Sequence, residues 1–260
     1  MGVEVILDTH IIVFYNQLIE NSIAVTTLMK HESNILIIDN SNKQPILERN
    51  QEFCTYQNIG YHSMNGNKGL ASAYNTAVSM IDTEWLIMWD QDTKINDDFF
   101  EKINLKNISE KVDILIPQIR ANEKIISPCS LVGPMVLNYN EFRTITAINS
   151  GMIIRKKALL EIGLYNDALF LDYIDHDLMN RFAKESYSIE YLKELVIEQQ
   201  FSSFELQSKD AALFRFKIYK KDFKVFCNEF PFGNIYSFIK ILYRSIKLNV
   251  KYKTFSFFMR

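Results

Sequence analysis

The sequence has few of the residues that build disulfide frameworks, cysteine metal sites or nucleic-acid surfaces. Its 260 residues include only three cysteines, Cys54, Cys129 and Cys227, which lie far apart and form no Cys-x-x-Cys pair. Neither a zinc site nor a set of disulfides is therefore expected, and a reducing cytoplasm fits this usage best. The net charge of −2 gives no general attraction to polyanions, so no nucleic-acid partner is expected.

Long apolar runs and a secretory leader are also missing. No apolar stretch reaches the length of a membrane span. The first ten residues carry Glu4 and Asp8 where a leader would be basic. Core-forming residues are abundant instead, because 48% of the chain is hydrophobic and only 23% is charged. We therefore expect a packed cytoplasmic protein and no global disorder.

Apolar segments rich in β-branched residues alternate with amphipathic ones. Residues 11–14, 34–38 and 53–59 read as strands, and residues 17–30 have a helical pattern. A strand, a helix and a strand at this spacing form a parallel pair, whose carboxyl ends share one edge of the sheet. The sequence thus predicts an α/β fold with a mostly parallel sheet. The later segments are expected to be helix at 97–107, strand at 112–117, strand and turn at 144–155, helix at 156–162 and strand at 188–196. Residues 122–142 are irregular by composition, which fits either a mobile loop near the site or a hairpin.

The most informative stretch is residues 84–94, Glu-Trp-Leu-Ile-Met-Trp-Asp-Gln-Asp-Thr-Lys. A short apolar run typical of a buried strand stops at Asp90 and Asp92, which places both at the sheet edge where α/β proteins bind ligands. Two carboxylates so close repel each other unless a cation lies beside them, and hard divalent cations prefer carboxylate oxygen. A metal site that also holds a diphosphate is one interpretation. An ordinary polar turn is the other.

Two further segments reach the same edge. Asp39 follows the strand at 34–38, where it would accept hydrogen bonds from a nucleobase or ribose, or simply cap a turn. Residues 65–75 form a loop of glycines and asparagines that opens a helix, and free N–H groups at a helix start favour phosphate. Lys68 adds positive charge. A plain loop-to-helix junction is the alternative.

A second acidic cluster lies in residues 169–182. The apolar residues from 174 to 182 fit one helix face, so Asp172 and Asp175 would stand at the helix start. Capping explains one aspartate but not the three in this segment. A carboxylate held beside Phe170 and Tyr173 would be suited to act as a general base.

The tail at residues 230–260 is basic and aromatic and contains no acid. This is typical of an amphipathic helix on an anionic membrane surface, which predicts peripheral contact with the inner face of the plasma membrane. A helix that packs on the domain, or on a second subunit of a homodimer, is the alternative. We expect two units, a catalytic and nucleotide-sugar-binding domain at 1–205 and a helical extension at 206–260.

With these motifs placed, the chain resembles the family 2 glycosyltransferases with the GT-A fold, particularly the bacterial rhamnosyltransferase-like branch. The resemblance spans roughly residues 11–196. The segments that carry it are Val-Phe-Tyr-Asn at 13–16, Ile-Ile-Asp-Asn-Ser at 37–41, the glycine loop at 65–75, Trp-Asp-Gln-Asp at 89–92, and Asn-Ser-Gly at 149–151 together with 170–177 and Arg181.

The resemblance implies inverting transfer of a sugar from a nucleotide diphosphate, dTDP-rhamnose or a UDP-hexose, to a saccharide or lipid-linked saccharide in O-antigen or capsule synthesis. Asp175 would be the catalytic base, with Asp172 and Asp177 as alternatives. Asp92, with Asp90, would hold Mg²⁺ or Mn²⁺ on the diphosphate. The resemblance assigns the nucleotide-sugar donor to Tyr15, Asn16, Asp39, Asn67, Gly69, Asn75, Asp90 and Gln91, and the acceptor to Ser150, Gly151 and Tyr173.

One departure from the family pattern matters. Many relatives have a histidine after the last core strand that helps to hold the metal, whereas residues 197–201 read Ile-Glu-Gln-Gln-Phe. Either Glu198 or a water substitutes, or metal binding is weak. The departure leaves open a non-catalytic nucleotide-sugar-binding or scaffold subunit with the same fold. A nucleotidyltransferase shares the acid pair but usually needs a glycine- and basic-rich loop near the N-terminus, and residues 15–20 have none.

Overall fold

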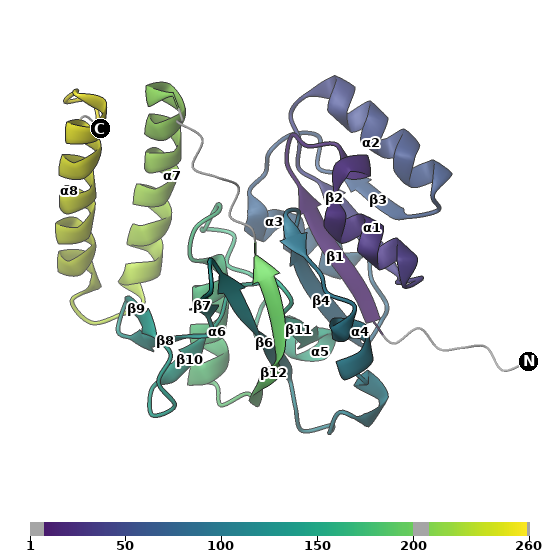
Figure 1. The fold of residues 1–260 in the computed structure, drawn as a ribbon. Coiled ribbons are helices and arrows are strands. Elements are labelled where there is room, and N and C mark those ends of the chain that lie inside the picture. Colours follow the sequence, from purple (N-terminus) through teal and green to yellow (C-terminus); the bar gives the residue numbers. More distant parts are fainter. Residues whose placement is uncertain (1–7, 200–207, 259–260) are drawn as a thin grey trace, which may run out of the picture.

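The computed structural model describes residues 8–199 and 208–258, which fold into a mixed α/β structure beside a pair of long helices (Figure 1). In these ranges the strands form a nine-stranded sheet, with the order β3-β2-β1-β4-β11-β6-β12-β5 and with β7 added to β6, and a three-stranded sheet with the order β10-β8-β9. The predicted α/β class with a mostly parallel sheet flanked by helices is confirmed.

The first half of the chain builds the parallel part of the large sheet. β1 pairs in parallel with β2 and with β4, and β2 pairs in parallel with β3. Their carboxyl ends therefore meet at one edge. The elements of this half are β1 (Asp8–Phe14), a 3₁₀ turn η1 (Ile19–Asn21), α1 (Ile23–Lys30), β2 (Ile35–Asp39), α2 (Gln44–Tyr56), β3 (Gly60–Ser63), α3 (Leu70–Ser79) and β4 (Trp85–Asp90).

The second half completes the sheet and curls it. β11 runs antiparallel between β4 and β6, and β12 pairs with β6 and also with the short β5. Since β5 directly follows β4, this last pairing brings the end of β12 back to the acid pair. The elements are β5 (Thr93–Lys94), α4 (Asp98–Lys102), a 3₁₀ turn η2 (Leu105–Asn107), β6 (Ile114–Ala121), β7 (Lys124–Ser127), β8 (Cys129–Val132), β9 (Met135–Asn138), β10 (Thr144–Thr146), β11 (Ile153–Arg155), α5 (Lys156–Glu161), α6 (Ile174–Lys184) and β12 (Ile189–Gln199).

The sheet is buried on both faces. Ile11 and Val13 of β1 belong to a core shared with α3, α6 and α7, whereas Ile12 and Phe14 belong to a core shared with α1 and α4. Successive residues of a strand point to opposite faces, so a strand covered on both sides reads as an unbroken apolar run. This is the physical reason for the apolar runs in the sequence.

The C-terminal helices α7 (Lys209–Asn228) and α8 (Gly233–Tyr252) form a hairpin, drawn in light green and yellow in Figure 1. Gly233 permits the tight turn, because a Cβ there would overlap the carbonyl oxygen of Cys227. No helix in the described residues is both long and apolar enough to cross a bilayer.

Three sequence-based assignments need correction. The strand expected at 53–59 is wrong, because those residues end α2 and the third strand starts at Gly60. Ile46, Asn50 and Cys54 recur at helical spacing on the inward side of α2, and this period overrides the strand-like composition. The segment 122–142 is not a loop despite its composition, since it forms β7, β8 and β9, and β8 and β9 pair as the hairpin that was the alternative. The helix expected from residue 17 begins only at Ile23, capped by the Ser22 hydroxyl.

Candidate functional site

The carboxyl ends of β2, β1 and β4 carry polar residues to one edge of the sheet. Phe14 of β1 pairs with Asp39 at the end of β2, and Val13 pairs with Asp90 at the end of β4. Neighbouring strands are about 4.8 Å apart, so the backbones of these two aspartates are separated by about 10 Å. The edge therefore holds one aspartate on each side of β1, as the parallel pairing predicts.

Asp90 marks the centre of an acidic region. Burial raises the pKa of its carboxyl to about 6, the hydrogen bond from Gln199 acts in the opposite direction, and the negative charges of Asp92 and Asp175 add to the rise. Such influence weakens with separation. The fold thus brings Asp175, which is distant along the chain, within electrostatic range of Asp90.

Gln199, which sequence reasoning missed, contacts this pair directly. Its Nε2 donates to Asp90 Oδ2 at 3.1 Å. Its Oε1 is buried and has no hydrogen-bond partner among the described residues. Glu198 lies one residue earlier in β12, is exposed and is paired in register with Lys94. Gln199, and not Glu198, therefore occupies the place nearest the acid pair.

The donors of this region fit a divalent cation in the company of a phosphate ligand. Across the described chain, no three His, Cys, Asp or Glu side chains come together as a complete metal site. The oxygens available are those of Asp90, Asp92 and the unpaired Gln199 Oε1, which are hard ligands suited to Mg²⁺ or Mn²⁺. Mg²⁺ is often held by one or two carboxylates together with substrate phosphates and waters. Such a cation would need the diphosphate of a donor to complete its coordination.

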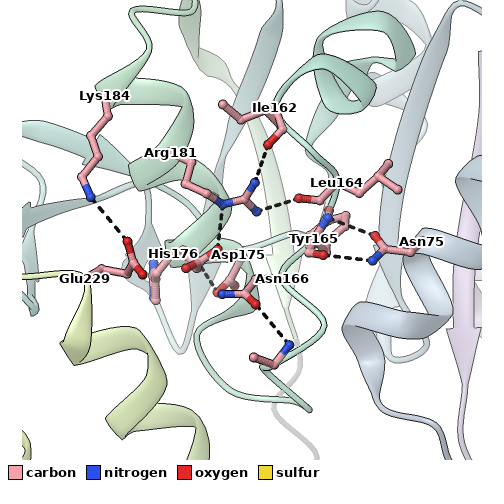
Figure 2. A network of polar contacts seen from close by, with 12 residues as sticks. Asn75, Ile162, Leu164, Tyr165, Asn166, Asp175, His176, Arg181, Lys184 and Glu229 are labelled. Atoms are coloured by element: carbon pink, nitrogen blue, oxygen red, sulfur yellow. Dashed lines mark hydrogen bonds and ion pairs between the residues drawn. The ribbon is translucent and has the colours of Figure 1, made fainter.

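The three aspartates of the second cluster have different surroundings. Asp177 is buried and pairs with Arg181 at 2.9 Å. The same guanidinium donates to the carbonyl oxygens of Ile162 and Leu164 at 2.9 and 2.7 Å (Figure 2). Asp177 therefore joins α6 to the segment that follows α5, which is a structural role.

Asp172 also has an arginine partner, whereas Asp175 has none among the described residues. Asp172 Oδ1 accepts from Nη2 of Arg215 on α7 at 2.6 Å. Asp175 is half-buried in the first turn of α6, and its Oδ1 accepts the backbone N–H of its neighbour His176 at 2.8 Å. No ion pair involves Asp175 in the part of the chain that the structure describes. Of the three, Asp175 has the carboxylate most available to a ligand.

α7 holds the loop that carries these aspartates. Asp222 is fully buried, and its carboxylate accepts the backbone N–H groups of Phe170, Leu171 and Asp172 at 2.8 to 3.0 Å. Tyr173, in the left-handed conformation at φ 65°, stacks on two phenylalanines of α7, Phe223 and Phe226. We name residues 170–173 the acceptor loop. Asp222 and Arg215 were missed because no spacing pattern links them to residues some fifty positions earlier.

The glycine loop touches the acceptor loop. Gly69 has φ 91°, and a Cβ there would lie 2.8 Å from the ring of Phe170. The N–H of Leu70 donates to the carbonyl oxygen of Phe170 at 2.6 Å. Asn67 Oδ1 accepts from Asn40 beside the end of β2 at 3.1 Å. The segment 65–75 thus joins the strand-end aspartates to the acceptor loop.

Three predicted binding residues have packing roles. Both atoms of the Asn75 amide bond the backbone of Tyr165, each at 2.9 Å (Figure 2). The Ser150 hydroxyl is buried and lies 2.6 Å from that of Thr93. Gly151 is buried with φ 74°, and a Cβ there would overlap the side chain of Ile197. These residues shape the walls around the acids, and their predicted contacts with ligands stay predictions.

Asp39 lies at the expected edge but is fully buried. It accepts hydrogen bonds from Ser41 N, Asn50 Nδ2 and Tyr61 Oη at 3.0, 2.7 and 3.1 Å. Its carboxylate therefore fixes the turn after β2. A direct bond to a nucleoside would use lone pairs that these donors leave.

Tyr15, Asn16 and Gln91 gather at the end of β1. The N–H of Tyr15 donates to Oε1 of Gln91 at 2.9 Å, and the N–H of Asn16 donates to the Ser41 hydroxyl at 2.7 Å. The Tyr15 side chain is 40% exposed. The three residues predicted to contact the donor thus lie together between Asp39 and Asp90.

Tyr74 of α3 is another residue that the sequence did not reveal. It is fully buried, and its hydroxyl has no hydrogen-bond partner in the described ranges. Burial raises the pKa of this hydroxyl well above its usual value, and the charges of Asp90, Tyr165 and Asp175 add to the rise. Its ring stacks on that of Tyr165 at 5.0 Å. A buried hydroxyl therefore lies beside the acidic region.

Comparisons of sequence place this architecture among known proteins. The family model described as "Glycosyl transferase family 2" matches residues 9–162. The curated protein dTDP-rhamnosyl transferase RfbF of Shigella flexneri is 22% identical over 178 residues, which cover 64% of this chain and 59% of that protein. The chain thus spans less than two thirds of the length of this relative.

Solved structures share the fold at low identity. The mannosyltransferase PcManGT from Pyrobaculum calidifontis, in complex with GDP-Man and Mn²⁺, has a TM-score of 0.59 at 13% identity, over 84% of this chain and 63% of that one. TarS of S. aureus has a TM-score of 0.53 at 16% identity, over 85% of this chain and 39% of that one. At these identities the likeness establishes the GT-A architecture, and the chemistry has to be argued from the residues.

Proposed function

The chain belongs to glycosyl transferase family 2, and on that premise we propose that it transfers a sugar from a nucleotide diphosphate donor to a saccharide acceptor, with inversion at the anomeric carbon. The observation that supports the proposal most is that the charges of Asp92 and Asp175 both raise the pKa of Asp90 at the end of β4. Asp90 and Asp92 would hold a cation on the leaving diphosphate, and Asp175 would accept the proton of the attacking hydroxyl.

On the donor side, residues of this chain bind and orient the nucleotide sugar. The nucleoside would lie beside Tyr15, Asn16 and the turn that Asp39 fixes. The sugar would lie beside the glycine loop. Asp90, Asp92 and Gln199 would hold Mg²⁺ or Mn²⁺ there. The cation, when bound, supplies positive charge that stabilises the departing diphosphate.

On the acceptor side, Asp175 takes the proton of the acceptor hydroxyl. The freed oxygen attacks the anomeric carbon, and the bond from that carbon to the diphosphate oxygen breaks with its electron pair on the diphosphate. Attack from the side opposite the leaving group inverts the centre. The assignment is supported by the partners of the other two aspartates, because Asp172 and Asp177 are each paired with an arginine.

The substrates are proposed from the relatives. RfbF is named a dTDP-rhamnosyl transferase, which supports dTDP-rhamnose as the donor. A UDP-hexose remains the second candidate, since PcManGT shows that this fold also accepts a GDP-linked hexose. We propose a lipid-linked saccharide as the acceptor, in the assembly of an O-antigen or capsule.

A panel of nucleotide sugars tests the proposal. The protein is incubated with dTDP-rhamnose, UDP-hexoses and GDP-mannose in the presence of Mn²⁺, and release of the nucleoside diphosphate is measured without acceptor. We expect slow release from one donor, absent in Asp92→Asn and unchanged in the control Asp82→Asn, whose side chain is fully exposed.

The alternative function is a non-catalytic nucleotide-sugar-binding or scaffold subunit, favoured by the absence of a histidine from residues 197–201. Tight binding of one nucleotide sugar, without turnover of any donor in the presence of acceptor extracts, would support that alternative. Binding of no member of the panel would contradict both functions.

A further inference from the structure

α8 presents a row of large apolar side chains to solvent. The buried positions of this helix are Gly233, Ser237, Ser245 and Asn249, which are small or polar. A surface helix ordinarily buries its apolar face and exposes its polar one. α8 packs Tyr236, Ile241 and Leu248, all half-buried, against the core, yet its exposed face is apolar as well. Packing against the described part of the chain does not explain that exposed face.

The exposed apolar side chains of α8 form one continuous stripe. They are between 43% and 74% exposed and recur at intervals of three and four residues, which places them on one side of a helix. Phe232 and Phe255, just beyond the two ends of the helix, are more than three quarters exposed as well. The residues that we name the outer stripe are Ile235, Phe238, Ile239, Leu242, Ile246 and Val250.

The charge around the outer stripe has a single sign. α8 contains Lys240, Arg244, Lys247 and Lys251, all exposed, and no acid. Residues 208–258 contain eleven lysines and arginines against three acids, which leaves 18 basic and 28 acidic residues in the rest of the chain. The helical hairpin is thus strongly positive, although the protein as a whole is slightly negative.

We propose that the outer stripe of α8 is a docking surface for an anionic phospholipid bilayer, on which the helix lies parallel to the membrane plane. Apolar side chains flanked by lysines match a layer of acyl chains beneath negative headgroups. A second copy of the chain fits less well, because a two-fold contact between two α8 helices would bring their cations together. The absence of a spanning helix among the described residues agrees with a surface location.

The hairpin is joined firmly to the acceptor loop. Asp222 and Arg215 of α7 bind the backbone and the Asp172 side chain of that loop. A bilayer on the outer stripe would therefore hold the acceptor side of the site at a constant position relative to the membrane. This consequence rests on the proposed sugar transfer, whereas docking itself does not.

Vesicle co-sedimentation tests docking without any sugar substrate. The full chain is mixed with vesicles of phosphatidylcholine alone and with vesicles that also contain phosphatidylglycerol. We expect binding to the phosphatidylglycerol vesicles that weakens as salt is raised, because salt screens exposed charges, and little binding to phosphatidylcholine alone.

Two sets of variants separate the apolar from the charged contribution. Phe238→Ser/Ile239→Ser is expected to weaken binding about tenfold or more, while the matched control Phe142→Ser, at an 89% exposed side chain outside the hairpin, leaves it unchanged. Lys240→Glu/Lys247→Glu/Lys251→Glu leaves the outer stripe intact and is expected to weaken binding about a hundredfold. Its control reverses three exposed lysines outside the hairpin, Lys106, Lys111 and Lys124.

Circular dichroism and thermal melting confirm that each variant is folded. The proposal is overturned if the unaltered chain does not bind phosphatidylglycerol vesicles, or if both α8 variants bind as well as it does. It is also overturned if the chain forms a dimer that Phe238→Ser/Ile239→Ser dissociates while no vesicle binding is seen, because a second copy would then cover the stripe. Since no nucleotide sugar is present, a failure here leaves the transferase proposal standing.

Discussion

The two sides of the acidic region are held in place by different means. Asp39 and Asp90 end strands that pair in register with β1, so backbone hydrogen bonds of the sheet determine where they lie. The acceptor loop begins beyond the family match at 9–162 and is held by Asp222, about fifty residues later in α7. The proposed donor side is therefore a property of the sheet. The proposed acceptor side is a property of the docked hairpin, and changes there should leave the donor side intact.

The largest effect is expected from Asp175→Asn. Removal of the general base should lower acceptor-dependent transfer by about a thousandfold, while the affinity for the donor stays within about twofold. Product formation measures the first quantity and titration calorimetry with the donor measures the second. A parallel loss of donor affinity would show that the two sides cannot be separated.

Asp92→Asn tests the donor side and should lower turnover about a hundredfold at limiting Mn²⁺. Because the amide keeps an oxygen but loses the charge, part of the activity should return as Mn²⁺ is raised. Chelation of the metal should have the same effect on the unaltered protein. Activity that is insensitive to chelator and to Asp92→Asn would contradict the metal role.

Asp222→Asn tests the tie between the hairpin and the acceptor loop. One charged acceptor of three backbone N–H groups is lost, so the free energy of unfolding should fall by about 2 kcal/mol. The KM for the acceptor should rise roughly tenfold with donor affinity unchanged, since a displaced loop misplaces the acceptor. Asp210→Asn, an exposed acid on the same helix, is the control. Unchanged hydrogen exchange at residues 170–172 would count against the tie.

The smallest expected effect distinguishes Gln199 from Glu198. Gln199→Leu removes the amide that donates a hydrogen bond to Asp90. The affinity for Mn²⁺ in the presence of the donor should fall about fivefold. Glu198→Gln, at the exposed neighbouring position, should leave Mn²⁺ affinity unchanged. The opposite result would mean that β12 is shifted by one residue in the active protein.

Much of the fold could be predicted from local sequence patterns, and the assignments that were wrong also have local causes. The buried strands were found because a strand covered on both faces leaves an uninterrupted apolar run. Residues 53–59 were misread because α2 has few apolar residues, and its helical period is visible only when buried Asn50 is counted among its inward side chains. The choice between a loop and a hairpin for segment 122–142 could not be made from the sequence, because short strands in a small sheet leave too few residues to set a pattern.

The residues of the candidate site likewise fall into those that local sequence patterns reveal and those that they do not. Asp90 and Asp92 could be picked out because they end an apolar strand, and Asp175 because its segment resembles a motif of the family. Asp177 pairs with an arginine four residues later, a helical spacing that the sequence displays. The partner of Asp172 is Arg215 on α7, 43 residues away, and no sequence spacing predicts this pair.

The sequence by itself determined the α/β class, the edge of the sheet at which the acids gather, and the apolar and basic character of α8, because each depends on residues close together in the chain. Only the tertiary structure decided that Asp175 is the cluster's unpaired aspartate and that Gln199 meets Asp90 across 109 residues. These outcomes depend on strand register and helix docking, where a shift of one residue turns a side chain to the opposite face.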